Sequence, residues 1–307
     1  MLARIRHYTL DEIRTAILQV DESVLTEQTI KQFLAFVPTA EEKGKLTAYT
    51  DNPEALAKGD RFFLEMMKID RYEPRLKAWY FKMTFGERFR ELEEQEFWQL
   101  PFFNTANCAS LVQDVNAIFA ASQALKESKT FLKILEVILT IGNFMNGTGY
   151  RGGAFGFRIN SINKLVDTKS TDNKTTLLHF LASTVESKFP ELLQIQTELN
   201  DVGPACRVSF AALRAEYAEI KSKLRMIRQE LESHHADSEN RQPDDKFVDM
   251  MTEFMSTAGE QFDNLDIRFT SMNIAYQDVV RMYGEDSSTM PPEEFFGIFR
   301  TFLSSFE

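Results

Sequence analysis

Cysteine, glycine and proline are all scarce in this sequence of 307 residues, which contains two, 13 and nine of them. The two cysteines, Cys108 and Cys206, form no Cys-x-x-Cys motif, so the sequence excludes a disulfide-rich scaffold and suits a reducing compartment. Few turn-forming residues favour long helices over a sheet of many strands. The longest uncharged run, residues 137–150, is shorter than the roughly 20 apolar residues that cross a bilayer, so we expect a cytoplasmic protein without a membrane span.

Signals for catalysis and metal binding are also sparse. The adjacent His234 and His235 would point about 100° apart on a helix, and they cannot converge alone on one metal ion. The sequence has no Gly-x-Ser-x-Gly motif and no Gly-Lys-Ser or Gly-Lys-Thr phosphate loop. We therefore expect no enzyme, no metal and no cofactor. The formal net charge of −11 does not favour nucleic acid as a partner.

Apolar residues recur in helical steps along nearly the whole chain, and no segment is convincingly predicted as a strand. Short helices are predicted over about the first 70 residues, and a longer one follows Pro74. The clearest pattern is a heptad seam: Phe210, Leu213, Tyr217, Ile220, Leu224, Ile227 and Leu231. A second heptad run, from Phe247 to Tyr283, follows a polar segment. Two such helices are expected to fold back antiparallel, which predicts an all-α chain with a stiff arm.

The segment "GNFMNGTGYRGGAFGF", residues 142–157, contains the pattern Gly-x-Gly-x-x-Gly. A dinucleotide site requires this pattern to follow a strand and to open a helix. Here a predicted helix precedes it, so we do not expect nucleotide binding. The following residues 151–175 carry five basic and two acidic side chains, a balance of 5 − 2 = +3 in an acidic chain. This patch is either a contact for an acidic partner or an ordinary solvated face.

The sequence from "GNFMN" through "GAFGFRINSINKLVDTKSTDNKTTLLHFL" resembles the formin homology 2 domain, and the resemblance covers residues 2–306. It implies an all-α, elongated helical rod that forms one formin homology 2 core, residues 1–307. The expected parts are a knob of short helices (1–73), the long helix of an arm (74–104), a globular helical post (105–205), and a coiled-coil return with a C-terminal helix (206–307).

The resemblance also implies a function. Members of the family nucleate actin filaments and follow the growing barbed end as a ring-shaped homodimer, in which an N-terminal lasso of one subunit wraps the post of the other. The implied actin-binding residues are Lys169, Lys164 and Arg158. The implied surface that receives the lasso is Gly142, Asn143, Met145, Asn146, Gly153, Gly156 and Phe157. From the residues alone, Asn143 and Asn146 could instead cap a helix, and Phe157 could be a core residue.

The sequence departs from the family pattern at its start, because the lasso, the linker and the proline-rich segment that recruits profilin are not in it. We therefore expect this chain to be mostly monomeric, to bind actin weakly, and to inhibit assembly rather than drive it. The alternative hypothesis is a helical scaffold without actin assembly activity that docks a microtubule or a Rho-pathway protein.

Overall fold

The computed structural model describes residues 7–89, 111–147, 152–234 and 244–306. Within these ranges the protein is all-α, which confirms the predicted fold class. An isolated antiparallel bridge between Lys169 and Thr176 is the only β pairing in the described residues. The chain divides into two compact units. Unit 1 takes its described residues from 1–98 and 218–263, and unit 2 from 99–217 and 264–307.

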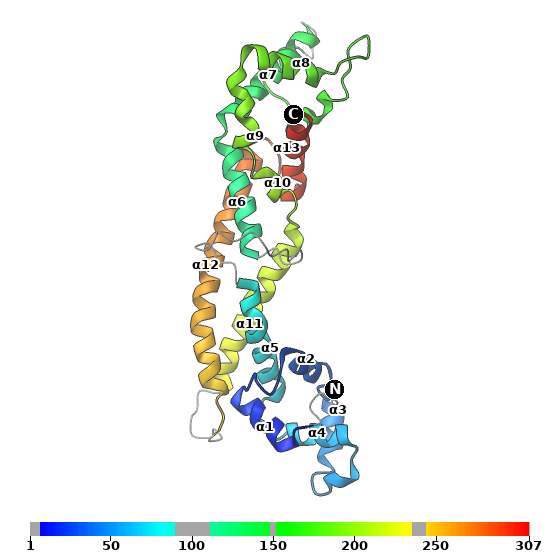
Figure 1. Cartoon of the computed structure of the whole chain (residues 1–307), viewed down its shortest axis with the longest axis vertical. Coiled ribbons are helices and arrows are strands. Elements are labelled where there is room, and N and C mark those ends of the chain that lie inside the picture. The colour runs from blue at the N-terminus through cyan, green and yellow to red at the C-terminus, as the bar shows by residue number, and fades with distance from the viewer. Residues whose placement is uncertain (1–6, 90–110, 148–151, 235–243, 307) are drawn as a thin grey trace. The chain divides into compact units, whose positions relative to one another are not determined.

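Unit 1 begins with short helices and ends its first segment with a long one (Figure 1). The helices are α1 (Leu10–Gln19), α2 (Glu27–Ala35), α3 (Ala40–Thr47), the 3-10 helix η1 (Pro53–Ala55), α4 (Lys58–Met66) and α5 (Tyr72–Phe89). A capping box starts α1, because the Thr9 hydroxyl accepts the Glu12 amide while the Glu12 carboxylate accepts the Thr9 amide. Thr39 and Glu42 start α3 in the same way. Residues 90–104 of the predicted arm helix lie outside the described residues.

The core of unit 1 lies between α5 and the short helices. Trp79 on α5 is buried, and the rings of Phe33 on α2 and Phe62 on α4 lie 5.0 Å apart between centroids. Helix α2 packs on α5, and both α1 and α3 pack on α4. Since α1 to α4 are each too short to be stable alone in water, this shared apolar core holds them in place.

Two arginines at the start of α5 tie unit 1 together. The Arg75 guanidinium donates from Nη1 and Nη2 to both carboxylate oxygens of Asp245, at 2.8 and 2.5 Å. It also lies over the ring of Phe247, 4.8 Å from the centroid. Arg71 makes a similar two-point contact with Glu230, at 2.7 and 2.5 Å. These pairs join the N-terminal segment to residues more than 150 positions later in the sequence.

The two heptad runs form α11 (Phe210–His234) and α12 (Phe247–Met282). The predicted seam is buried at Leu213, Ile220, Leu224 and Ile227, as the heptad spacing requires. The first part of α11 and the last part of α12 belong to unit 2, and the remainder of both helices belongs to unit 1. This pairing of opposite ends is expected of two helices that fold back on each other.

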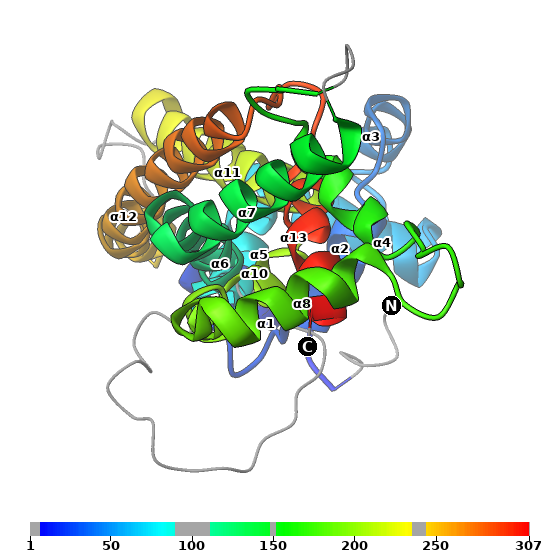
Figure 2. The same ribbon diagram turned by 90° about the horizontal axis from the view of Figure 1, so that it is seen from above.

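Unit 2 is built around α13 (Pro292–Phe306). Its other helices are α6 (Leu111–Glu127), α7 (Lys129–Asn146), η4 (Ile159–Leu165), α8 (Leu177–Lys188), η5 (Pro190–Gln194), α9 (Ile195–Glu198) and α10 (Val202–Ala205). Figures 1 and 2 show α13 lying among these helices, where it contacts α8, α10 and η4. Its phenylalanines are almost completely buried, and Phe299 packs edge-on against Phe131 of α7 and Tyr283.

Burial raises the pKa of three tyrosines well above their usual range: Tyr72, Tyr276 and Tyr283. Tyr283 donates a hydrogen bond to the Leu125 carbonyl at 2.9 Å, and Tyr276 donates to that of Met290 at 2.6 Å. Because the pKa of these phenols is higher in the folded state, burying them in the neutral form stabilises the fold. This contribution is fully present below about pH 10, the pKa of an unfolded tyrosine, and is lost as the pH rises further.

We predict that the chain unfolds at alkaline pH. The phenolates of these three tyrosines, measured by absorbance at 295 nm, should appear only together with loss of the helical circular dichroism. Their ionisation before that loss would contradict the prediction.

None of the described helices is both long enough and apolar enough to cross a membrane.

Candidate partner-binding surface

The C-terminal end of α7 is fixed to the segment that follows the glycine loop. The Asn143 side chain donates from Nδ2 to the Ala154 carbonyl at 2.9 Å, and its Oδ1 accepts from the Ala154 amide at 2.8 Å. Asn143 therefore pairs with the backbone of a later segment and does not cap its own helix. The helix ends at Gly147, whose φ of 62° lies in the left-handed region that favours glycine. Residues 148–151 lie outside the described residues.

Large apolar side chains are exposed on both sides of this junction. Phe144 on α7 is 87% exposed and Phe155 is fully exposed, whereas Met145 and Phe157 are about half and one-third exposed. The alternative that Phe157 is a core residue is therefore not supported by its burial. Exposed aromatic residues gathered in one region mark an interaction surface more often than singly scattered ones.

The sequence reasoning missed Phe144 and Phe155. Helical phase gives only a weak signal for the first, because Phe144 lies ~120° around α7 from the buried Ile138 but ~80° from the buried Ile134. In the last turn of α7 both Phe144 and Met145 are exposed.

Of the predicted basic residues, Lys164 lies in η4 and Arg158 is its N-cap residue. A 3-10 helix has three residues per turn, so side chains at i, i+3 and i+6 are eclipsed. One such row, Ile159, Ile162 and Leu165, is buried against the core. Another row runs from Arg158, the N-cap residue, to Lys164, and both of these side chains are exposed. The same periodicity therefore buries one face of η4 and places two cations on another.

Lys169 is held in a hydrogen-bonded turn directly after η4. The Thr168 amide and hydroxyl both donate to the Lys164 carbonyl, at 3.1 and 3.0 Å, and the Leu177 amide donates to the Thr168 carbonyl at 2.7 Å. The turn closes through the Ser170 amide, which donates to the Thr175 carbonyl at 2.9 Å. The backbone beside Lys169 is thus fixed on both sides. Its exposed ammonium group has no ion-pair partner among the described residues.

The region keeps a positive charge in the folded chain. Hydrogen bonds from the Ser170 hydroxyl and the Lys174 amide hold the pKa of Asp172 below its ordinary value, so this carboxylate is charged and already engaged. The described residues from 152 to 175 carry four basic and two acidic side chains, a balance of 4 − 2 = +2: Arg158, Lys164, Lys169 and Lys174 against Asp167 and Asp172.

Two surfaces are named here by their residues. The basic surface is Arg158, Lys164 and Lys169, and the aromatic surface is Phe144, Met145, Phe155 and Phe157. Both belong to unit 2.

Comparison with protein families identifies the fold. The model of the Formin Homology 2 Domain matches residues 1–96 and 102–307. The chain belongs to the formin homology 2 family. This confirms the resemblance seen in the sequence, and the formin homology 2 domain is a non-enzymatic module.

Individual relatives agree with this assignment. The formin homology 2 chain is 38% identical over 298 residues to Disheveled-associated activator of morphogenesis 2 of Homo sapiens, covering 96% of the chain and 26% of the relative. It is 35% identical over 297 residues to Disheveled-associated activator of morphogenesis 1 of Mus musculus, with coverage of 96% and 26%. With Protein diaphanous homolog 3 of Rattus norvegicus it shares 32% identity over 296 residues, with coverage of 96% and 23%. The chain therefore spans about a quarter of the length of these relatives.

The glycine-rich segment has a structural role in this formin homology 2 chain. It follows helix α7, whereas a dinucleotide site needs a strand at this place. Two of its glycines, Gly147 and Gly153, have positive φ values of 62° and 69°. They let the backbone turn back so that Ala154 reaches Asn143. Gly142 lies within α7, and Gly156 has open space at the position of a Cβ.

We predict that Asn143→Ala releases the loop without unfolding the chain. The substitution removes two hydrogen bonds to a partly exposed site, each worth about 0.5–1.5 kcal/mol net. The Ala154 amide is expected to exchange with deuterium at least tenfold faster, while exchange in the α13 core stays unchanged. Hydrogen exchange measured by mass spectrometry tests this, with Asn160→Ala on η4 as the control. Equal exchange in the wild type and Asn143→Ala would contradict it.

Proposed function

We propose that this chain is the actin-binding core of a formin, and that its basic surface contacts actin at the barbed end of a filament. The observation that carries the proposal is the setting of Lys169, an exposed and unpaired lysine in a turn fixed by backbone hydrogen bonds. In the complete dimeric domain this contact would serve filament nucleation and elongation. The proposal places the protein in the cytoplasm, on the actin cytoskeleton.

Electrostatics support an acidic partner at this surface. The chain has a net charge of −11, so a general attraction to the acidic surface of actin is not expected. A local group of cations attracts such a partner only where it is needed, and it sets the orientation and the association rate. Because the basic surface is placed by η4 and the following turn, little conformational entropy is lost when it binds.

The second part of the proposal concerns the aromatic surface. We infer that an apolar segment from another copy of the domain docks on it. The receiving surface would also include Gly142, Asn143, Asn146, Gly153 and Gly156 of this chain. The exposed rings of Phe144 and Phe155 support this, because they would gain hydrophobic stabilisation from such a segment. The 307-residue chain by itself is expected to be monomeric. Light scattering coupled to size exclusion should give the mass of one chain, and a dimer that persists on dilution would contradict this.

Co-sedimentation with polymers tests the proposed function. The chain is expected to pellet with actin filaments in a saturable manner and to remain in solution with microtubules at the same protein concentration. Binding should weaken as salt rises from 50 to 200 mM, because the proposed contact is electrostatic. Pelleting with microtubules but not with actin would instead support the alternative of a scaffold without actin activity. Binding to neither polymer would contradict the proposal.

A further inference from the structure

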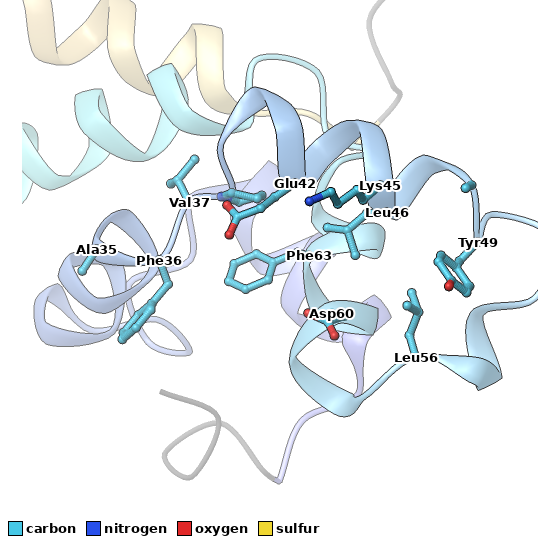
Figure 3. Close-up of a pocket in the computed structure, with 12 residues that line it drawn as sticks. Ala35, Phe36, Val37, Glu42, Lys45, Leu46, Tyr49, Leu56, Asp60 and Phe63 are labelled. Atoms are coloured by element: carbon cyan, nitrogen blue, oxygen red, sulfur yellow. The ribbon is translucent and has the colours of Figure 1, made fainter.

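Unit 1 contains a pocket that the proposed function does not use. It lies between the α2–α3 connection, α3 and α4, and its volume is about 790 Å³ (Figure 3). This lies within the range of 300–1,000 Å³ that is typical of ligand sites in proteins. The apolar side chains that line it are Phe36, Val37, Leu46, Tyr49, Leu56 and Phe63. Helix α2 ends at Ala35 and Pro38 follows shortly after, so the chain turns here and leaves a gap between α2 and α3.

Two aromatic side chains of the pocket are uncovered. Phe36 is 57% exposed and Tyr49 is 45% exposed, whereas Leu46, which also lines the pocket, is buried. In Figure 3, Phe36 lies at one end of the pocket, Tyr49 lies at the other, and the ring of Phe63 lies between them. Covering such rings removes apolar surface from water and contributes about 25 cal/mol per Å². An apolar side chain is therefore the main feature expected of an occupant.

The charges of the pocket indicate a second feature. Glu42 and Asp60 both line it, and in Figure 3 they stand on opposite sides of the Phe63 ring. The hydrogen bonds that Glu42 accepts from Thr39 lower its pKa, so this carboxylate is charged at neutral pH. Asp60 has no ion-pair partner among the described residues. The one lysine in the lining, Lys45, is already paired with Glu41 at 2.7 Å.

We propose that this pocket docks a short segment of a partner protein in which a bulky apolar residue stands next to lysine or arginine. The apolar residue would insert between Phe36, Phe63 and Tyr49. The basic residue would reach Glu42 and Asp60, assisted by the carboxyl end of α2, where the helix dipole favours positive charge. The pocket is expected to prefer a positively charged segment, whereas the basic surface in unit 2 is expected to prefer a negatively charged partner. The chain would thus bind an acidic partner through one unit and a basic segment through the other.

Selection from a displayed library of random 12-residue peptides, with the 307-residue chain as bait, tests the proposal. Selected peptides are expected to share an aromatic or branched apolar residue within two positions of lysine or arginine. Synthetic copies should bind at least tenfold more weakly to Phe36→Ser and about fivefold more weakly to Asp60→Asn. The effect of Asp60→Asn should shrink at 0.5 M salt.

Matched controls come from the same unit. Tyr8→Ser changes an aromatic side chain of similar exposure, and Asp51→Asn removes an exposed carboxylate, both outside the pocket lining. Neither is expected to change peptide binding, and all four variants should keep the wild-type helical content because the positions are exposed. Selected peptides without the pattern, equal binding to Phe36→Ser, or no selected peptide would overturn the proposal. If the chain forms a dimer and Phe36→Ser dissociates that dimer, the pocket binds a second copy of the chain instead. This result would also overturn the proposal.

Discussion

Replacing Lys169 with alanine is expected to raise about tenfold the concentration of chain needed for a half-maximal effect on actin assembly, which corresponds to ~1.4 kcal/mol. The expectation rests on the fixed turn around Lys169, where Thr168 binds both the Lys164 carbonyl and the Leu177 amide. A lysine on a mobile loop would lose both side-chain and backbone freedom on binding. Lys169 would lose mainly side-chain freedom, because its backbone is already fixed. The measurement is pyrene-actin assembly titrated with each variant.

Lys129→Ala is the matched control, because Lys129 is also an exposed lysine of unit 2 but lies at the other end of α7. It is expected to behave like the wild type. Lys164→Ala and Arg158→Ala should each have a smaller effect than Lys169→Ala. Equal effects of the wild type and Lys169→Ala would remove Lys169 from the contact.

The second large effect concerns stability. Removing the Asp245 carboxylate by Asp245→Ala is expected to lower the free energy of unfolding of unit 1 by about 3–5 kcal/mol. The side chains of Arg75 and Asp245 are only 5% and 6% exposed, so the substitution leaves a buried guanidinium without its counter-charge. It also removes the oxygen that accepts the Phe247 amide at the start of α12. The double variant Arg75→Met/Asp245→Leu should recover most of the loss, because neither charge then remains buried.

The fluorescence of Trp79 reports on unit 1 in urea, provided that the other tryptophan is removed by Trp98→Phe in every variant. Glu230→Ala is the internal comparison. It leaves Arg71 without this partner, but the Arg71 side chain is 35% exposed and its guanidinium is partly solvated, so we expect a loss well below that of Asp245→Ala. A loss under 1 kcal/mol for Asp245→Ala would contradict the role given to this pair.

The sequence allowed the helical class and the heptad seam to be predicted, because these depend on local signals. Apolar spacing locates the buried face of α11. The ion pairs of Arg71 and Arg75 could not be predicted. Each joins residues more than 150 positions apart, and an arginine is normally exposed, whereas Arg75 is buried.

The candidate site was predicted in part. The family motif pointed to Asn143, but only the structure shows its contact with Ala154 across the glycine loop. Ile159, Ile162 and Leu165 form the buried row of η4. Its period of three is what places Arg158 and Lys164 on one row. The pocket of unit 1 left no signal in the sequence, because its walls come from three separate helices and their connections.

Elongation of single actin filaments, observed by fluorescence microscopy, tests the central claim most directly. With saturating wild-type chain, growth at the barbed end is expected to slow while growth at the pointed end is unchanged, and Lys169→Ala at the same concentration should have little effect. Unchanged growth at the barbed end under saturating wild-type chain would contradict the claim that this chain is the actin-binding core of a formin.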